Sequence, residues 1–184
     1  QVLADAAAGS NDPAKILHEM IATNRDPIFV VATADKTAAF EGEEIIVTWT
    51  LYNATSVQQY AISEIPKLED FWTEELDVRN EVPSRALVDG MVLQTLPIRR
   101  VALFPLRSGT LSIGSMEIAG AVMRRIDAGP FGLFEGSLVE VRFPSAASTV
   151  DVKPIPPGPP VDAVGDLTLT CSPPAQKNGG PVVV

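Results

Sequence analysis

The residues of this chain that are most able to do chemistry are a single histidine, His18, and a single cysteine, Cys171. They stand far apart in sequence, whereas a general base must lie within hydrogen-bond reach of its nucleophile. The serines fall in turn contexts and complete no Ser/His/Asp set, and no phosphate-loop, dinucleotide-binding or zinc-protease motif occurs. We therefore expect no enzyme, no catalytic residue and no cofactor.

Carboxylate ligands for a metal ion are the next candidates, because the chain has 23 aspartates and glutamates. With one histidine and one cysteine, a zinc site would lack its usual nitrogen and sulfur ligands. The acidic runs at 41–44 and 70–77 lack the ligand spacing of a calcium loop. We expect these runs to be solvated acidic edges and predict no metal site.

An adjacent aromatic pair, Phe71 and Trp72, stands in an acidic segment that follows Pro66. Adjacent residues of a strand point to opposite faces, so at least one ring is expected to anchor in the core. An exposed ring beside Glu74 and Glu75 would suit a basic patch on a partner, with the ring supplying affinity and the carboxylates steering the encounter. The alternative is that both rings are buried and the carboxylates only keep an edge soluble. These four residues, Phe71, Trp72, Glu74 and Glu75, are the candidate partner-binding site.

The charge balance argues against other partners. Lysines and arginines number 14 against the 23 acidic residues, which gives a net charge of −9. Nucleic acids and anionic lipid surfaces both attract basic stripes, so neither is an expected ligand. No apolar run approaches the roughly 20 residues of a membrane span, and we expect this segment not to be inserted in a membrane.

The hydrophobic pattern predicts strands over most of the chain. Between Glu44 and Tyr52 the apolar residues recur every second position, as they do in a strand with one buried face. Further strands are expected at 28–32, 60–63, 91–96, 98–104, 110–113, 116–124, 138–142 and 149–153. Short strands with frequent turns predict an all-β, immunoglobulin-like β-sandwich. Its expected core contains Val47, Trp49, Leu51, Val101, Leu103, Leu111, Ile113 and Ile118.

Turn residues predict how some of these strands are connected. One extended run ends at Pro105, and a second begins at once after Gly109, which can adopt the positive φ of a tight turn. We expect these two runs to form a hairpin. Residues 36–42 are expected to form a turn, and residues 131–136 a loop whose two aromatics lie under the edge of a sheet.

A short amphipathic helix is predicted near the N-terminus. Asp12 can cap it, and Pro13 can take the first helical position, where its missing N–H costs nothing. The helix should end near Asn24. Four apolar residues form its stripe: Ile16, Leu17, Met20 and Ile21.

Three regions differ in composition. Residues 1–25 form an N-terminal arm with the short helix, 26–154 the β-sandwich, and 155–184 a Pro-rich linker with the first strand of a following domain. Five prolines stand between 154 and 160, which predicts a semi-rigid polyproline II spacer. Residues 166–171 then alternate as a new strand would. We expect the chain to be a fragment of a longer multidomain protein.

Four segments, in this order, resemble the BatD family of bacterial oxygen-tolerance proteins, which are encoded in aerotolerance operons. They are DPIFVVATADKTAAFEGEEIIVTWTLYN (26–53), ISEIPKLEDFWTEEL (62–76), RRVALFPLRSGTLSIGSMEI (99–118) and VDVKPIPPGPPVDAVGDLTLT (150–170). The order of the four is more specific than any one of them. The chain departs from the family at Asp70, where a small residue is common, and at Gly114-Ser115, where a proline is common.

The resemblance implies an internal immunoglobulin-like module of a periplasmic or cell-envelope protein that a C-terminal helix anchors in the membrane. It also implies von Willebrand A-type membrane proteins as partners, a MoxR-type ATPase across the membrane, and no enzymatic activity. We therefore expect a protein-interaction or scaffold module. The alternative is a carbohydrate-binding or adhesin module that uses exposed aromatics such as Trp72, Phe131 or Phe134 as a sugar platform.

Overall fold

The computed structural model describes residues 10–54, 57–128, 133–158 and 164–165 of the chain. The helix and strands found there are α1 Pro13–Ala22, β1 Ile28–Ala34, β2 Ala38–Phe40, β3 Ile45–Asn53, β4 Val57–Glu64, β5 Phe71–Leu76, β6 Ser84–Val88, β7 Met91–Pro105, β8 Gly109–Ile113, β9 Glu117–Ala128, β10 Leu133–Pro144 and β11 Ser148–Lys153. The predicted all-β class with a short N-terminal helix is confirmed. The expected strand at 166–171 lies outside the described residues.

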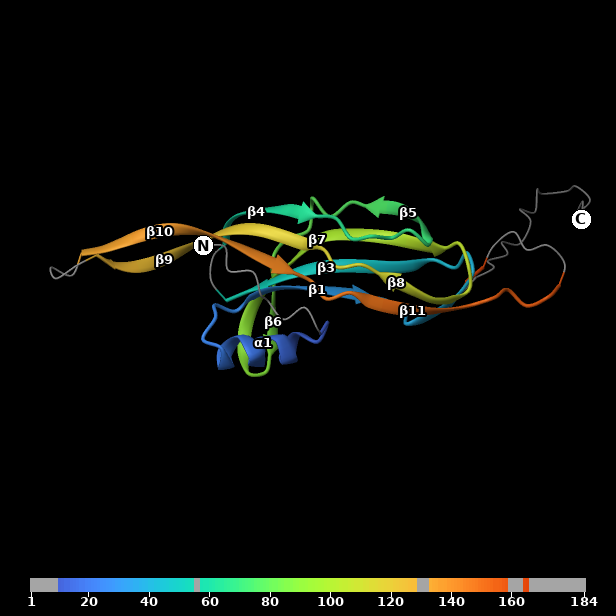
Figure 1. Ribbon diagram of the computed structural model, residues 1–184, viewed down its shortest axis with the longest axis horizontal. Coiled ribbons are helices and arrows are strands. Elements are labelled where there is room, and N and C mark those ends of the chain that lie inside the picture. The colour runs from blue at the N-terminus through green and yellow to red at the C-terminus, as the bar shows by residue number, and fades with distance from the viewer. Residues whose placement is uncertain (1–9, 55–56, 129–132, 159–163, 166–184) are drawn as a thin grey trace, which may run out of the picture.

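The strands form three sheets that enclose one core in a sandwich-like arrangement (Figure 1). The largest sheet has the order β1-β3-β7-β5, and β6 also pairs with β7. It is covered by the β10-β9-β4 and β2-β11-β8 sheets, whose side chains meet those of the first sheet in the core. The pairing of β2 with β11 is parallel and the other pairings of described strands are antiparallel, which is consistent with an immunoglobulin-like sandwich.

The alternation of buried side chains that the sequence predicts for β3 is present in the structure. Its residues alternate between buried and partly buried from Ile45 to Asn53. All eight predicted core residues expose 2 % of their surface or less. Each such side chain contributes about 1.5–3 kcal/mol by leaving water, so this core is the main source of stability.

Helix α1 begins after Asp12, whose carboxylate accepts a hydrogen bond from the backbone N–H of Ala14 at 3.0 Å. Its buried side chains pack against β1 and the β6–β7 hairpin: Ile16, Leu17 and Met20. The predicted stripe was one residue too wide, because Ile21 is 53 % exposed. The helix covers one face of β1 while the sandwich core covers the other, which explains why β1 is an unbroken apolar run.

The turn at 106–109 connects two sheets, so the predicted hairpin is wrong. Gly109 has a φ of 115°, and β7 ends at Pro105, as predicted. Strand β8, however, pairs with β11, whereas β7 pairs with β3, β5 and β6. Turn chemistry is local, but the choice of a ladder partner depends on residues far away in the sequence.

The predicted strands 91–96 and 98–104 are one strand, β7, with an irregularity at Pro97. Thr50 pairs with Pro97 and Trp49 with Arg99, so Ile98 is an extra residue in the ladder. Proline has no N–H to donate, and within sheets it is therefore found at such bulges. The bulge lies between the part of β7 that pairs with β6 and the part that pairs with β5.

Three strands were not predicted: β2, β5 and β6. The predicted turn at 36–42 contains β2, which pairs with β11. The predicted loop at 131–136 is also wrong from Leu133 onward, because β10 begins there and pairs with β9. Its residue Phe131 lies outside the described residues. Short strands at a sheet edge carry many exposed or charged side chains, so they lack the alternation that reveals a central strand.

Candidate functional site

The four predicted partner-binding residues lie on β5, an edge strand whose ladder partner among the described residues is β7. Phe71 is 6 % exposed and packs in the core, while Trp72 is 56 % exposed. One ring therefore anchors the strand and the other faces solvent, as adjacent strand residues must. The alternative in which both rings are buried is wrong for Trp72.

The exposed ring of Trp72 does not stand alone. Trp72 lies opposite Phe104 in the ladder, and the two ring centroids are 5.0 Å apart at an interplanar angle of 50°. Glu74 is exposed two residues further along β5, on the same face of the sheet. We call this surface, made of Trp72, Glu74 and Phe104, the aromatic face.

An ion pair holds the beginning of β5 beside this surface. Arg107 donates to both carboxylate oxygens of Asp70, at 2.7 and 2.8 Å. The hydrogen bonds from Arg107 hold the pKa of Asp70 below its usual range. The backbone N–H of Leu106 also donates to the Asp70 carbonyl oxygen at 3.0 Å. Asp70 thus ties the 106–109 turn to β5.

Glu75 belongs to the opposite face of β5. It lies opposite the core residue Val101 in the ladder, and its carboxylate accepts hydrogen bonds from Arg99. The four predicted residues therefore do not form one surface. Trp72 and Glu74 point away from the sandwich core, whereas Phe71 and Glu75 are on the core side.

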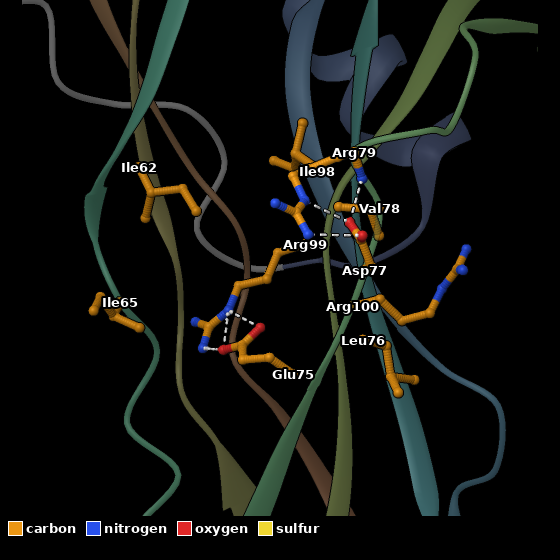
Figure 2. Close-up of a pocket in the computed structure, with 10 residues that line it drawn as sticks. All are labelled: Ile62, Ile65, Glu75, Leu76, Asp77, Val78, Arg79, Ile98, Arg99 and Arg100. Atoms are coloured by element: carbon orange, nitrogen blue, oxygen red, sulfur yellow. Dashed lines mark hydrogen bonds and ion pairs between the residues drawn. The ribbon is translucent and has the colours of Figure 1, made fainter.

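Beside Glu75, a groove of about 570 Å³ separates β4 from β5 and β7 (Figure 2). Ile62 and Ile65 line it from the β4 side, and Glu75, Ile98 and Arg99 line it from the other side. We call this feature the edge groove. Both isoleucines are exposed, at 42 % and 65 %, although they are large aliphatic residues.

Arg99 is the unusual residue of the edge groove. Its side chain is 14 % exposed, and its guanidinium carbon lies 5.6 Å from the ring centroid of Trp49. Nε and Nη2 donate to Glu75, but Nη1 is buried and has no hydrogen-bond partner among the described residues. A buried cation whose donors are not all paired is suited to bind a carboxylate ligand.

Two further arginines line the groove, but the guanidinium group of each is already hydrogen-bonded to a carboxylate. Arg79 donates to both carboxylate oxygens of Asp77, and these bonds lower the pKa of Asp77 to about 2. Arg100 points away from the groove (Figure 2), where it donates to Thr48 at 3.2 Å and to Glu81 at 3.0 Å. Arg99 is therefore the lining arginine with a buried donor left over.

His18 is exposed on α1, and Cys171 lies outside the described residues. The described ranges contain no group of three or more histidine, cysteine, aspartate or glutamate side chains that could hold a metal ion. Nor does the part of the chain that the structure describes contain a helix of the length and hydropathy needed to cross a membrane.

Sequence reasoning singled out the residues of β5 as a candidate site but missed the edge groove. The groove depends on the pairing of Trp49 with Arg99, which are far apart in the sequence. The available signal was a pair of arginines, Arg99 and Arg100, within an otherwise apolar predicted strand.

No protein-family model, curated protein or solved structure matches this chain. Membership of the BatD family therefore stays a prediction that depends on the four segments quoted above.

Proposed function

We propose that this chain is a non-catalytic protein-interaction module that binds a partner through the aromatic face. The observation that carries the proposal is Trp72, which leaves 56 % of its surface exposed on an edge strand and packs against Phe104. Tryptophan is enriched among the residues that dominate binding energy, since it offers a large rigid area at little cost in conformational entropy.

The chemistry of the partner follows from the surrounding charges. Glu74 is exposed next to Trp72, and the whole chain carries a net charge of −9. A basic patch on the partner would be attracted over a distance of about one Debye length, roughly 8–10 Å at physiological salt. The ring would then supply affinity after the encounter.

The resemblance to BatD proteins supports a cellular setting for this module. It suggests an aerotolerance protein in the periplasm or cell envelope, with the full-length protein anchored in the membrane. It also suggests a von Willebrand A-type membrane protein as the partner. This setting is part of the proposal, since it depends on the four sequence segments alone.

A binding experiment with the soluble domain of a von Willebrand A-type protein from an aerotolerance operon tests the proposal. Replacing Trp72 by alanine should weaken binding about 30-fold, the equivalent of a 2 kcal/mol hot spot. Leu87 is 73 % exposed on β6, away from this surface, so Leu87→Ala is the matched control and should bind like the wild type. Equal binding by wild type and Trp72→Ala would refute the aromatic face as the docking surface.

The same exposed ring also suits the carbohydrate-binding alternative, because sugars stack on tryptophan. Glycan-array binding that is lost in Trp72→Ala would favour this alternative over a protein partner. The side chain of Phe134 and the whole of Phe131, the other two predicted platform residues, lie outside the described part of the structure.

A further inference from the structure

The two strands that flank the edge groove both have a free edge. Within the described ranges, β4 pairs with β9 alone and β5 with β7 alone. They belong to different sheets and lie along the same side of the sandwich (Figure 1). A free edge presents backbone N–H and C=O groups that an extended segment of another protein can bind.

The groove offers both aliphatic side chains and a cation, and together these indicate the chemistry of its ligand. The exposed side chains of Ile62 and Ile65 would lose contact with water if an aliphatic segment covered them. Arg99 adds a buried donor, Nη1, that has no partner among the described residues. Because Nη1 itself is buried, a ligand in the groove reaches this guanidinium through Nε and Nη2, the two donors that Glu75 occupies.

The ion pair at the groove can be opened by a ligand. Arg99 is held in place over Trp49 with 14 % of its side chain exposed, whereas the side chain of Glu75 is 62 % exposed. Glu75 can therefore turn into solvent while Arg99 stays where it is. A carboxylate from a partner would then compete with Glu75 for the same guanidinium.

We propose that the edge groove binds an extended segment of a partner protein in which an acidic side chain lies between aliphatic residues. The segment adds to the free edge of β5, its carboxylate accepts hydrogen bonds from Arg99, and its aliphatic side chains cover Ile62 and Ile65. This site lies on the opposite face of β5 from Trp72. It is independent of the function proposed for the aromatic face.

The probe is a fluorescein-labelled peptide of about eight residues in which valine and threonine alternate and one central residue is glutamate. Two matched peptides carry glutamine or lysine at that position. Fluorescence anisotropy with the wild-type chain should show binding in the order glutamate, glutamine, lysine. Hydrogen bonds between two charged groups are stronger than those to a neutral amide, so the glutamate peptide should bind about tenfold more tightly than the glutamine peptide.

Three substitutions test the contacts. Arg99→Leu should abolish the preference for glutamate, and Ile65→Asp, at a residue that is 65 % exposed, should weaken the glutamate peptide about tenfold by repulsion with little effect on folding. Glu75→Gln removes the competing carboxylate and should strengthen binding about two- to fivefold, the range expected from an exposed ion pair. A purely structural role of the Arg99–Glu75 pair would give no such gain.

Leu87→Ala, at an exposed residue of β6 away from the edge groove, is the control and should leave binding of the peptide unchanged. The proposal is overturned if no peptide binds, if the glutamate and glutamine peptides bind equally, or if Glu75→Gln weakens binding. Because Arg99 packs on Trp49, the folding of Arg99→Leu is checked by circular dichroism. If that variant does not fold, the results for Ile65→Asp and Glu75→Gln decide.

Discussion

Replacing Phe71 and Trp72 by alanine, one at a time, tests the alternation that defines the candidate site. Phe71 is 6 % exposed, so nearly all of a side chain of about 200 Å² is buried. At about 25 cal/mol per Å², its removal costs roughly 4–5 kcal/mol, which agrees with the 3–5 kcal/mol typical of core phenylalanines. Phe71→Ala should therefore remove a large part of a total stability of about 5–15 kcal/mol.

Trp72 is the larger residue, yet its removal should cost less. It is 56 % exposed, so roughly 110 Å² of its approximately 250 Å² is buried, the equivalent of about 2.7 kcal/mol. The unfolded chain already buries part of this area, which reduces the expected cost to about 2 kcal/mol. Trp72→Ala should thus cost about half as much as Phe71→Ala.

Urea unfolding followed by far-ultraviolet circular dichroism measures both free energies of unfolding, with an unchanged dependence on urea as the sign that two-state unfolding is kept. If Phe71→Ala does not fold, the milder Phe71→Leu replaces it and should still cost more than about 0.5 kcal/mol. A cost for Trp72→Ala equal to that of Phe71→Ala would show that the ring at position 72 is buried. The aromatic face would then not exist.

Three further measurements check the structure around the site. Acrylamide should quench only part of the tryptophan fluorescence, and Trp72→Phe should leave a blue-shifted, unquenched signal; a wild-type signal that is wholly unquenched would contradict the exposed ring. The hydrogen bond from Lys36, at 2.8 Å, lowers the pKa of Glu43, so its stabilisation is complete above the usual glutamate value near 4.3 and is lost as the pH falls through the lower folded value. The urea midpoint of Glu43→Gln should therefore fall less steeply in acid than that of the wild type. A Cβ at Gly114 would lie 2.7 Å from the backbone nitrogen of Lys67, so Gly114→Ala should cost about 1–3 kcal/mol in urea unfolding, and no loss would show that the loop can shift.

The sandwich could be predicted because its central strands carry their own signal. In β3, the alternation from Ile45 to Leu51 requires no knowledge of the rest of the chain, and every second residue, starting with Ile45, is buried. The capped helix α1 is equally local, since Asp12 bonds to Ala14 two residues away. Patterns of this kind depend on the two periods, 2.0 and 3.6 residues, that the backbone itself imposes.

What could not be predicted depends on pairing over long distances in the sequence. The run that ends at Pro105 and the run that begins at Gly109 are neighbours in the chain, and a hairpin was the simplest expectation. Instead β8 pairs with β11, whose residues are about 40 positions away, as in the pair of Leu111 with Val150. Neither strand contains a local signal for this choice, because both are short apolar runs that fit several partners.

The candidate site could be predicted only in part, because it depends both on local periodicity and on strand pairing between distant residues. The period of two correctly placed Phe71 and Trp72 on opposite faces, and the same period assigns Glu74 to the face of Trp72 and Glu75 to that of Phe71. The four residues were predicted as one surface because they are contiguous in sequence, but contiguity in a strand separates side chains. An edge strand therefore offers two surfaces with different chemistry. On β5 one has an exposed indole beside a carboxylate, and the other has Arg99 with a buried donor that has no partner within the described residues.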